Sequence, residues 1–183
     1  MPTDFHIRPA EPRDVPAILG LIRELAEFEQ LLHLVQATPE KLHAQLFGPR
    51  PAAECVVVDV PADHGAGAGA QQVQVQVQVQ DQAPPLVAFA LFFTNFSTFL
   101  AQPGLYLEDL YVRPAQRGHG LGKALLRHLG ALAVERGCGR FEWSVLDWNE
   151  TAIGFYRRMG ATVMPDWRIC RITGQQLQVY ARG

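Results

Sequence analysis

A glycine-rich segment in the second half of the chain is the part of the sequence best suited to bind a charged ligand. Residues Arg117–Lys123 read R-G-H-G-L-G-K and lie between a predicted strand and a predicted helix. Glycines let the backbone approach an anion closely because they have no Cβ. The first turn of the helix adds free N–H groups and the positive end of the helix dipole. The segment therefore predicts a pyrophosphate-binding loop; the alternative is a tight strand-to-helix turn that binds nothing.

The spacing of these glycines distinguishes between kinds of pyrophosphate ligand. The Walker nucleotide-binding pattern requires glycine where Arg117 stands and a magnesium-binding hydroxyl where Ala124 stands. The dinucleotide pattern requires a further glycine where Lys123 stands. The pattern that fits is Arg117-x-x-Gly120-x-Gly122, which resembles the coenzyme A loop of the GNAT acetyltransferase superfamily.

The resemblance extends to further blocks in the order and spacing of that family. The chain is similar to the diamine acetyltransferase branch, which includes spermidine/spermine and thialysine acetyltransferases. The matching blocks are Leu25–Glu29, Tyr106–Val112, Leu146–Asn149 and Gly154–Ala161. The resemblance implies a single α/β domain of GNAT type over residues 1–183, with a mixed, mostly antiparallel twisted sheet of about six or seven strands and about four helices. It also implies acetyl-coenzyme A as the co-substrate, a small-molecule amine as the acceptor, and a homodimer.

Acetyl transfer to an amine requires two proton movements. A primary ammonium must lose a proton before it attacks the thioester, and the leaving thiolate is stabilised by gaining one. The resemblance assigns Glu108 as the base, acting through water, and Tyr156 as the acid. Successive strand residues face opposite sides, so Asp109 reaches the substrate only if the strand contains a bulge. The alternatives are an acidic pair in ordinary salt bridges and a tyrosine packed on the sheet.

The resemblance also implies which residues contact each substrate. Strand backbone, the glycine loop and the start of a later helix are expected to bind coenzyme A through Leu110, Tyr111, Val112, Arg117, Gly118, His119, Gly120, Leu121, Gly122, Lys123, Asn149 and Tyr156. The amine site is expected to contain Phe28, Glu29, Glu108, Asp109 and Trp167.

Two departures from the spermidine-type members bear on the amine. Gln30–Leu32 stands where those relatives are more acidic, and Phe96–Phe99 lacks their aspartate near Ser97. Both favour a short diamine or a lysine analogue such as thialysine over a long polyamine. The alternatives from other classes are a protein or peptide N-acetyltransferase and a non-catalytic acyl-coenzyme A sensor. The presence of both Glu108 and Tyr156 favours an enzyme, because a sensor needs neither.

Hydrophobic periodicity and turn residues predict the elements that position these residues. Strands are expected where short runs are apolar and β-branched, at 5–8, 55–60, 86–93, 105–112 and 140–146, with a final hairpin of 167–172 and 176–180 about Thr173-Gly174. Helices are expected after caps at Asp14, Thr38 and Asn149, and another begins near Leu121 and ends at Gly137. A Gly/Ala and Gln/Val tract at about 62–85 is expected to be an irregular hairpin insertion.

Composition limits the remaining function classes. The chain has 183 residues and a formal charge of −2, without the excess of basic residues typical of nucleic-acid binding. It lacks a signal-peptide pattern and an apolar run long enough to span a membrane, which favours a cytoplasmic protein. Its three cysteines and six histidines show no metal-ligand spacing, so no metal is expected.

Overall fold

The computed structural model describes residues 5–59 and 85–182. These residues belong to two compact units, Met1–Ser144 and Val145–Gly183, which are described separately below. The predicted insertion at 62–85 lies outside the described residues except for Pro85.

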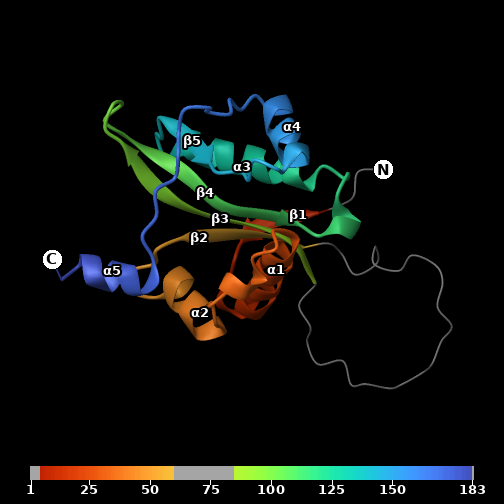
Figure 1. The fold of residues 1–183 in the computed structure, drawn as a ribbon. Helices are drawn as coiled ribbons and strands as arrows, with labels where there is room; N and C mark the ends of the chain where they lie inside the picture. Colours follow the sequence, from red (N-terminus) through yellow and green to blue (C-terminus); the bar gives the residue numbers. More distant parts are fainter. Residues whose placement is uncertain (1–4, 60–84, 183) are drawn as a thin grey trace, which may run out of the picture. The chain divides into compact units, whose positions relative to one another are not determined.

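The first unit is built on a mixed sheet (Figure 1). Its strands lie side by side in chain order: β1 (His6–Pro9), β2 (Glu54–Asp59), β3 (Leu86–Ser97), β4 (Gln102–Val112) and β5 (Arg140–Trp143). Neighbours are antiparallel except β4 and β5, which are parallel. The predicted α/β class with a mostly antiparallel sheet is confirmed, but the described residues form five strands where six or seven were expected.

Helices cover both faces of this sheet (Figure 1). On one face, α1 (Val15–Phe28) and α2 (Pro39–Phe47) form a buried cluster with alternate residues of the strands. That cluster includes Val57 of β2, Phe89 of β3 and Tyr111 of β4. On the other face, α3 (Leu121–Glu135) packs against β4. The predicted cap of α2 is confirmed, because the Thr38 hydroxyl accepts a hydrogen bond from the Lys41 N–H at 3.3 Å.

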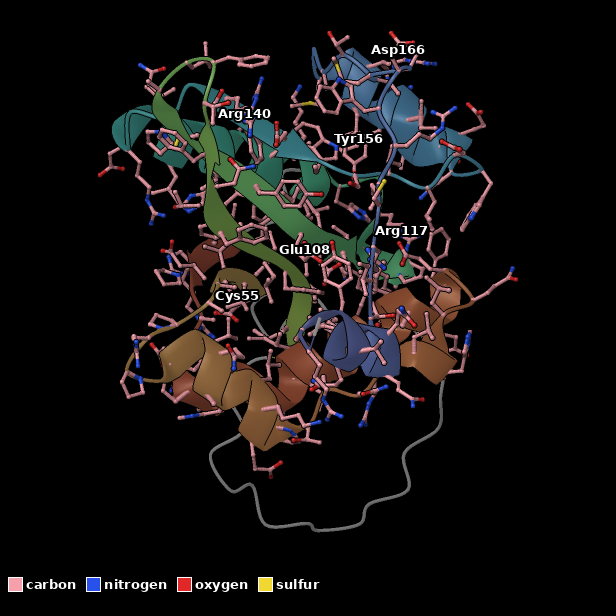
Figure 2. The ribbon with its side chains drawn as sticks, turned by 60° about the vertical axis from the view of Figure 1, so that its left-hand side comes forward. Cys55, Glu108, Arg117, Arg140, Tyr156 and Asp166 are labelled. Atoms are coloured by element: carbon pink, nitrogen blue, oxygen red, sulfur yellow. The ribbon has the colours of Figure 1, made fainter. Side chains whose placement is uncertain are left out.

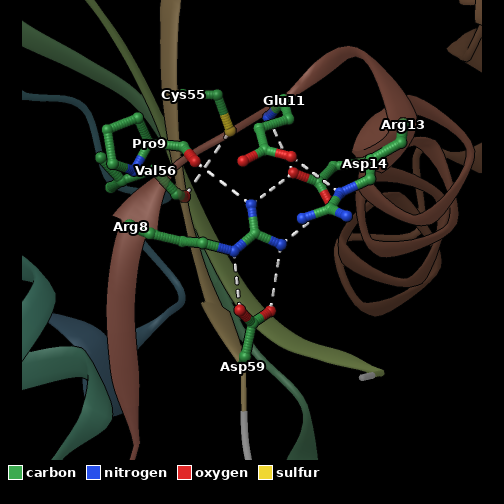
Figure 3. A network of polar contacts seen from close by, with 8 residues as sticks. All are labelled: Arg8, Pro9, Glu11, Arg13, Asp14, Cys55, Val56 and Asp59. Atoms are coloured by element: carbon green, nitrogen blue, oxygen red, sulfur yellow. Dashed lines mark hydrogen bonds and ion pairs between the residues drawn. The ribbon is translucent and has the colours of Figure 1, made fainter. Parts of the chain in front are cut away.

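The predicted cap of α1 has a different role from the one expected. Asp14 stands at the cap position, but its side chain makes no capping bond to the helix. Its carboxylate instead accepts hydrogen bonds from the Arg8 guanidinium at 2.6 Å and from the Glu11 N–H at 2.7 Å (Figure 3). Arg8 also donates to Asp59 at 2.7 Å, so one guanidinium joins β1, β2 and the start of α1. Burial by itself would raise the pKa of Asp14, but the bonds from Arg8 and Glu11 hold this pKa below its usual value.

Asp14→Asn is expected to destabilise the first unit by about 3 kcal/mol at neutral pH, because it breaks a buried ion pair. Asp14 is 3% exposed. The native pKa is depressed, so the ionised carboxylate stabilises the fold above its unfolded pKa of ~3.9, and this contribution is lost as the pH falls through the native pKa. The difference in free energy of unfolding between wild type and variant, measured by urea titration, should therefore shrink in acid. Arg13→Gln, which breaks the exposed pair of Arg13 with Glu11, is the control and should change stability by less than about 1 kcal/mol.

The second unit contains α4 (Glu150–Arg158) and α5 (Gly174–Tyr180). The predicted C-terminal hairpin is wrong: 167–172 forms no strand, and 176–180 lies within α5. Glutamine alternates with an apolar residue only over 176–179, and so short a run does not distinguish a strand from a helix by its period. Trp167 and Ile169 are largely exposed, so 167–172 buries no apolar face of the kind that would hold a strand in a sheet. The strand expected at 140–146 ends at Trp143.

Candidate functional site

The edge of β4 is open where the candidate site begins. β5 pairs with β4 only along Gly104–Leu107, and no described strand pairs with that edge from Glu108 onward. The N–H of Arg113 bonds to the Val87 carbonyl on β3 at 3.0 Å. Backbone groups alternate sides along a strand, so those of Leu110 and Val112 point to the open edge. The backbone of Tyr111 points to β3, and its side chain packs against α1.

A β-bulge lies where β5 separates from β4. Leu107 is opposite Phe92 of β3, but Asp109 is opposite Leu91, which leaves Glu108 as an extra residue. Glu108 is labelled in Figure 2. Leu91 belongs to the face covered by α1, and therefore Asp109 does too. Glu108 follows Leu107, which is on the opposite face, so the bulge places both carboxylates on the α1 side of the sheet.

A third carboxylate comes from the end of α1. Glu29 directly follows the helix and is half-buried, and this burial raises its pKa. Burial, then the negative charges of Glu108 and Glu29, raise the pKa of Asp109 to about 6. The charges of Glu108 and Glu29 are thus close enough to Asp109 to oppose its ionisation, and a bound cation would relieve that repulsion.

The glycine loop connects β4 to α3. Gly118 and Gly120 have φ values of 83° and 87°, in the left-handed region that favours glycine. The first backbone bond of α3 runs from the Ala124 N–H to the Gly120 carbonyl. The N–H groups of Leu121, Gly122 and Lys123 precede it, so they have no acceptor within the helix and lie at its positive end. Gly118, His119, Gly120 and Lys123 are exposed, whereas the side chain of Leu121, the first residue of α3, is buried.

Arg117 links the loop back to the sheet and to α1. Its Nε donates to the Val112 carbonyl at 2.9 Å. Its guanidinium carbon lies 5.3 Å from the ring centroid of Phe28 and 5.6 Å from that of Tyr111. Phe28 and Glu29, predicted for the amine site, are consequently adjacent to the predicted coenzyme loop.

The remaining predicted site residues belong to the second unit. Asn149 caps α4, with its side-chain oxygen accepting from the Ala152 N–H at 3.1 Å. Tyr156 lies on α4, half-buried, with its ring 5.4 Å from that of Phe155. Trp167 follows α4 and is exposed. The first unit thus brings together Phe28, Glu29, Glu108, Asp109 and the glycine loop, and the second unit carries the other three residues.

The sequence analysis did not identify two side chains of the first unit that help to form the candidate site. Glu24 pairs with Arg113 at 2.8 Å and thereby ties α1 to the end of β4. In the sequence, the role of Glu24 was indicated only by its position one helical turn before Phe28. The Tyr111 side chain was also missed, because only its backbone was assigned a role.

Two kinds of site have no counterpart in the part of the chain that the structure covers. Across residues 5–59 and 85–182, histidine, cysteine and acidic side chains form no group of three or more that could hold a metal ion. None of the helices described above combines the length and apolar character needed to cross a membrane.

Comparison with known sequences points to one family. Residues 55–161 match the model of the Acetyltransferase (GNAT) family. The chain is 39% identical over 196 residues to an L-ornithine N5-acetyltransferase of Arabidopsis thaliana, covering 94% of this chain and 86% of that relative. It is 33% identical to a thialysine N-epsilon-acetyltransferase of Bos taurus, covering 96% of each chain.

Comparison with solved structures shows that the fold of this chain occurs in other proteins. An integron cassette protein from the mobile metagenome of V. cholerae superposes with a TM-score of 0.72 at 21% identity, covering 98% of each chain. At this identity the likeness concerns the fold alone.

Proposed function

Because the chain belongs to the GNAT acetyltransferase family, we propose that it transfers the acetyl group of acetyl-coenzyme A to the side-chain amine of a short amino acid or diamine. The enzyme class is an acetyl-coenzyme A-dependent N-acetyltransferase of small-molecule amines. It follows from the family and from relatives, aligned over most of their length, that are named for ornithine and thialysine. The residue roles and the identity of the amine are the proposal.

One observation carries the proposal: the open edge of β4 runs from the three carboxylates to the glycine loop. Pantetheine would pair with the Leu110 backbone and the Val112 N–H as an added strand. The pyrophosphate would bind the free N–H groups at the start of α3. The thioester would then lie near the bulge, where the carboxylates would hold the ammonium group of the acceptor.

The proposed roles are divided among the acidic residues and the tyrosine. Asp109 and Glu29 bind the substrate ammonium, and their shared negative charge favours a cation. Glu108, exposed at the bulge, removes the proton through water. Tyr156 protonates the leaving thiolate, and Asn149 and Trp167 contribute to the coenzyme and amine sites.

Thiol release from acetyl-coenzyme A across a panel of acceptors tests the function. L-ornithine, thialysine and 1,4-diaminobutane are expected to be turned over with higher kcat/KM than spermidine, because the amine site offers few carboxylates for additional cations. Turnover of a peptide amine alone would contradict the small-molecule assignment.

The pH dependence tests the role of Asp109. With the pKa of Asp109 at about 6, the carboxylate is neutral below this pH and loses its attraction for the ammonium. The kcat/KM for the amine is therefore expected to fall as the pH is lowered through about 6. Asp109→Asn should lower kcat/KM at pH 8 and remove this acid limb, whereas Glu108→Gln should keep the limb at a reduced rate. An acid limb that survives in Asp109→Asn would assign it to another group.

A further inference from the structure

Arg117 joins two elements of the fold, the end of β4 just before it in the sequence and the distant helix α1. Its side chain bonds to the end of β4 at the Val112 carbonyl and lies over the rings of Phe28 on α1 and Tyr111 on β4. A guanidinium within about 6 Å of an aromatic centroid is attracted by the ring. The Val112 carbonyl is on the open edge, so Arg117 occupies the acceptor nearest to the loop.

A second arginine strengthens the same connection. Arg113 begins the turn that leads to the loop, and its guanidinium pairs with both carboxylate oxygens of Glu24 at 2.8 to 3.2 Å. Glu24 and Phe28 are four residues apart and hence lie on the same side of α1. The last two turns of α1 are thus held against the end of β4 by Arg113 and Arg117 together.

The position of Phe28 connects Arg117 to the proposed amine site. Phe28 ends α1 and Glu29 follows it directly, beyond which Gln30 adopts a left-handed conformation with φ 61°. The direction in which Glu29 points therefore depends on how the end of α1 is fixed. Arg117 fixes that end from within the segment that also contains the coenzyme-binding glycines.

We propose that Arg117 is a positioning residue that couples the two substrate sites: by holding Phe28 against β4, its guanidinium keeps Glu29 in place for the amine and links this placement to the conformation of the coenzyme loop. The inference rests on the proposed function. Coenzyme binding orders the loop, and this order improves amine binding. By linkage, the amine improves coenzyme binding by the same factor.

Substitutions at Arg117 separate this role from a direct contact with coenzyme. Arg117→Gln keeps a side-chain N–H for the Val112 carbonyl but removes the cation from the two rings. We expect this variant to raise the KM for the amine about fivefold, as the loss of exposed cation–π contacts would give. The affinity for coenzyme A should stay within about twofold, because backbone N–H groups supply the phosphate contacts. Arg117→Lys, which keeps the cation, should restore most of the amine KM.

A double-mutant cycle tests whether the effect passes through Phe28. Phe28→Leu combined with Arg117→Gln should raise the amine KM no more than the larger single effect, because both changes break one interaction. Arg127→Gln removes one positive charge from an exposed position on α3 and should leave the amine KM unchanged. Additive effects of Phe28 and Arg117, or a tenfold loss of coenzyme affinity with an unchanged amine KM, would overturn the proposal.

Calorimetry distinguishes failure of this inference from failure of the proposed function. The Kd of coenzyme A is measured with and without saturating L-ornithine in wild type and in Arg117→Gln. The wild type is expected to bind coenzyme A more tightly with ornithine, and the variant should lose this difference. The same coupling factor in both proteins would overturn the inference even if the enzyme turns ornithine over, whereas absence of thiol release with any amine would concern the proposed function only.

Discussion

Gly120→Val is expected to abolish acetyl-coenzyme A binding while leaving the fold intact. Gly120 has φ 87°, and a Cβ there would meet no neighbouring atom within 4 Å. The substitution therefore acts through backbone conformation and not through a clash, because valine strongly disfavours the left-handed region. A loop that leaves this conformation would turn the N–H groups of the first turn of α3 away from the pyrophosphate. Loss of two hydrogen bonds to a charged group costs about 3 kcal/mol or more, which corresponds to at least a hundredfold higher Kd.

Isothermal calorimetry with acetyl-coenzyme A checks this result, and circular dichroism checks that the variant is folded. Gly130→Ala on the same helix is the matched control, because a Cβ there also meets no atom and φ is not in the left-handed region. Alanine in a helix interior stabilises by about 0.5–1 kcal/mol relative to glycine, so this control should bind normally and unfold at a higher temperature. Near-normal binding by Gly120→Val would show that the loop is not part of the coenzyme site.

Tyr156→Phe is expected to lower kcat by about 10²–10⁴-fold, the usual contribution of one proton-transfer group, with acetyl-coenzyme A affinity nearly unchanged. The ring keeps its packing, and only the hydroxyl is lost. Reference pKa values of ~10 for tyrosine and ~8.5 for a thiol make proton donation to the thiolate uphill by only about 2 kcal/mol. The loss should therefore appear in departure of the thiolate, and single-turnover kinetics with saturating coenzyme would measure it.

Glu108→Gln provides the contrasting case. It removes the proposed base, and raising the pH should partly rescue turnover because more of the amine is then already neutral. The same rise in pH should not rescue Tyr156→Phe, which lacks the acid. If both variants responded to pH in the same way, the assignment of base and acid would fail; near-normal turnover in both would favour catalysis by proximity alone.

The local structure of the glycine loop could be predicted well because it depends on a pattern of neighbouring residues. Positive φ values at Gly118 and Gly120 and the start of α3 at Leu121 follow from glycine spacing and helix termination over a few residues. The strand before the loop was also predictable, since Leu105–Val112 is apolar enough to be buried. Coenzyme contacts themselves stay a prediction.

The amine side could not be derived in the same way. Strand alternation alone would place Glu108 and Asp109 on opposite faces, and only the pairing of β4 with β3 reveals the bulge. Such pairing depends on contacts between residues distant in the sequence, and a single sequence does not reveal these contacts. The proximity of Glu29 and the interaction of Arg117 with Phe28 have the same origin, because α1 and the loop are separated by almost ninety residues.

In the C-terminal segment, the prediction failed because the local sequence pattern itself was ambiguous. The residues from Gln176 to Tyr180 fit both a short strand and part of a helix, and the structure has the helix. The expectation of a hairpin came from two short apolar runs about the Thr173-Gly174 turn, and this local pattern is not sufficient, because 167–172 forms no strand.

The bulge at Glu108 also restricts how this gene can gain or lose codons. Leu105 and Leu107 are buried on the α3 side of β4, whereas Tyr111 is buried on the α1 side. The one extra residue is what allows a single strand to supply both hydrophobic cores from odd-numbered positions. Deletion of one codon at this point would exchange the faces of everything from Asp109 to the loop, sending Tyr111 away from α1 and Leu110 toward it. The length of β4 is therefore fixed by the packing on both sides of the sheet, and selection on folding alone would preserve the bulge that places residues 108 and 109 on the same face.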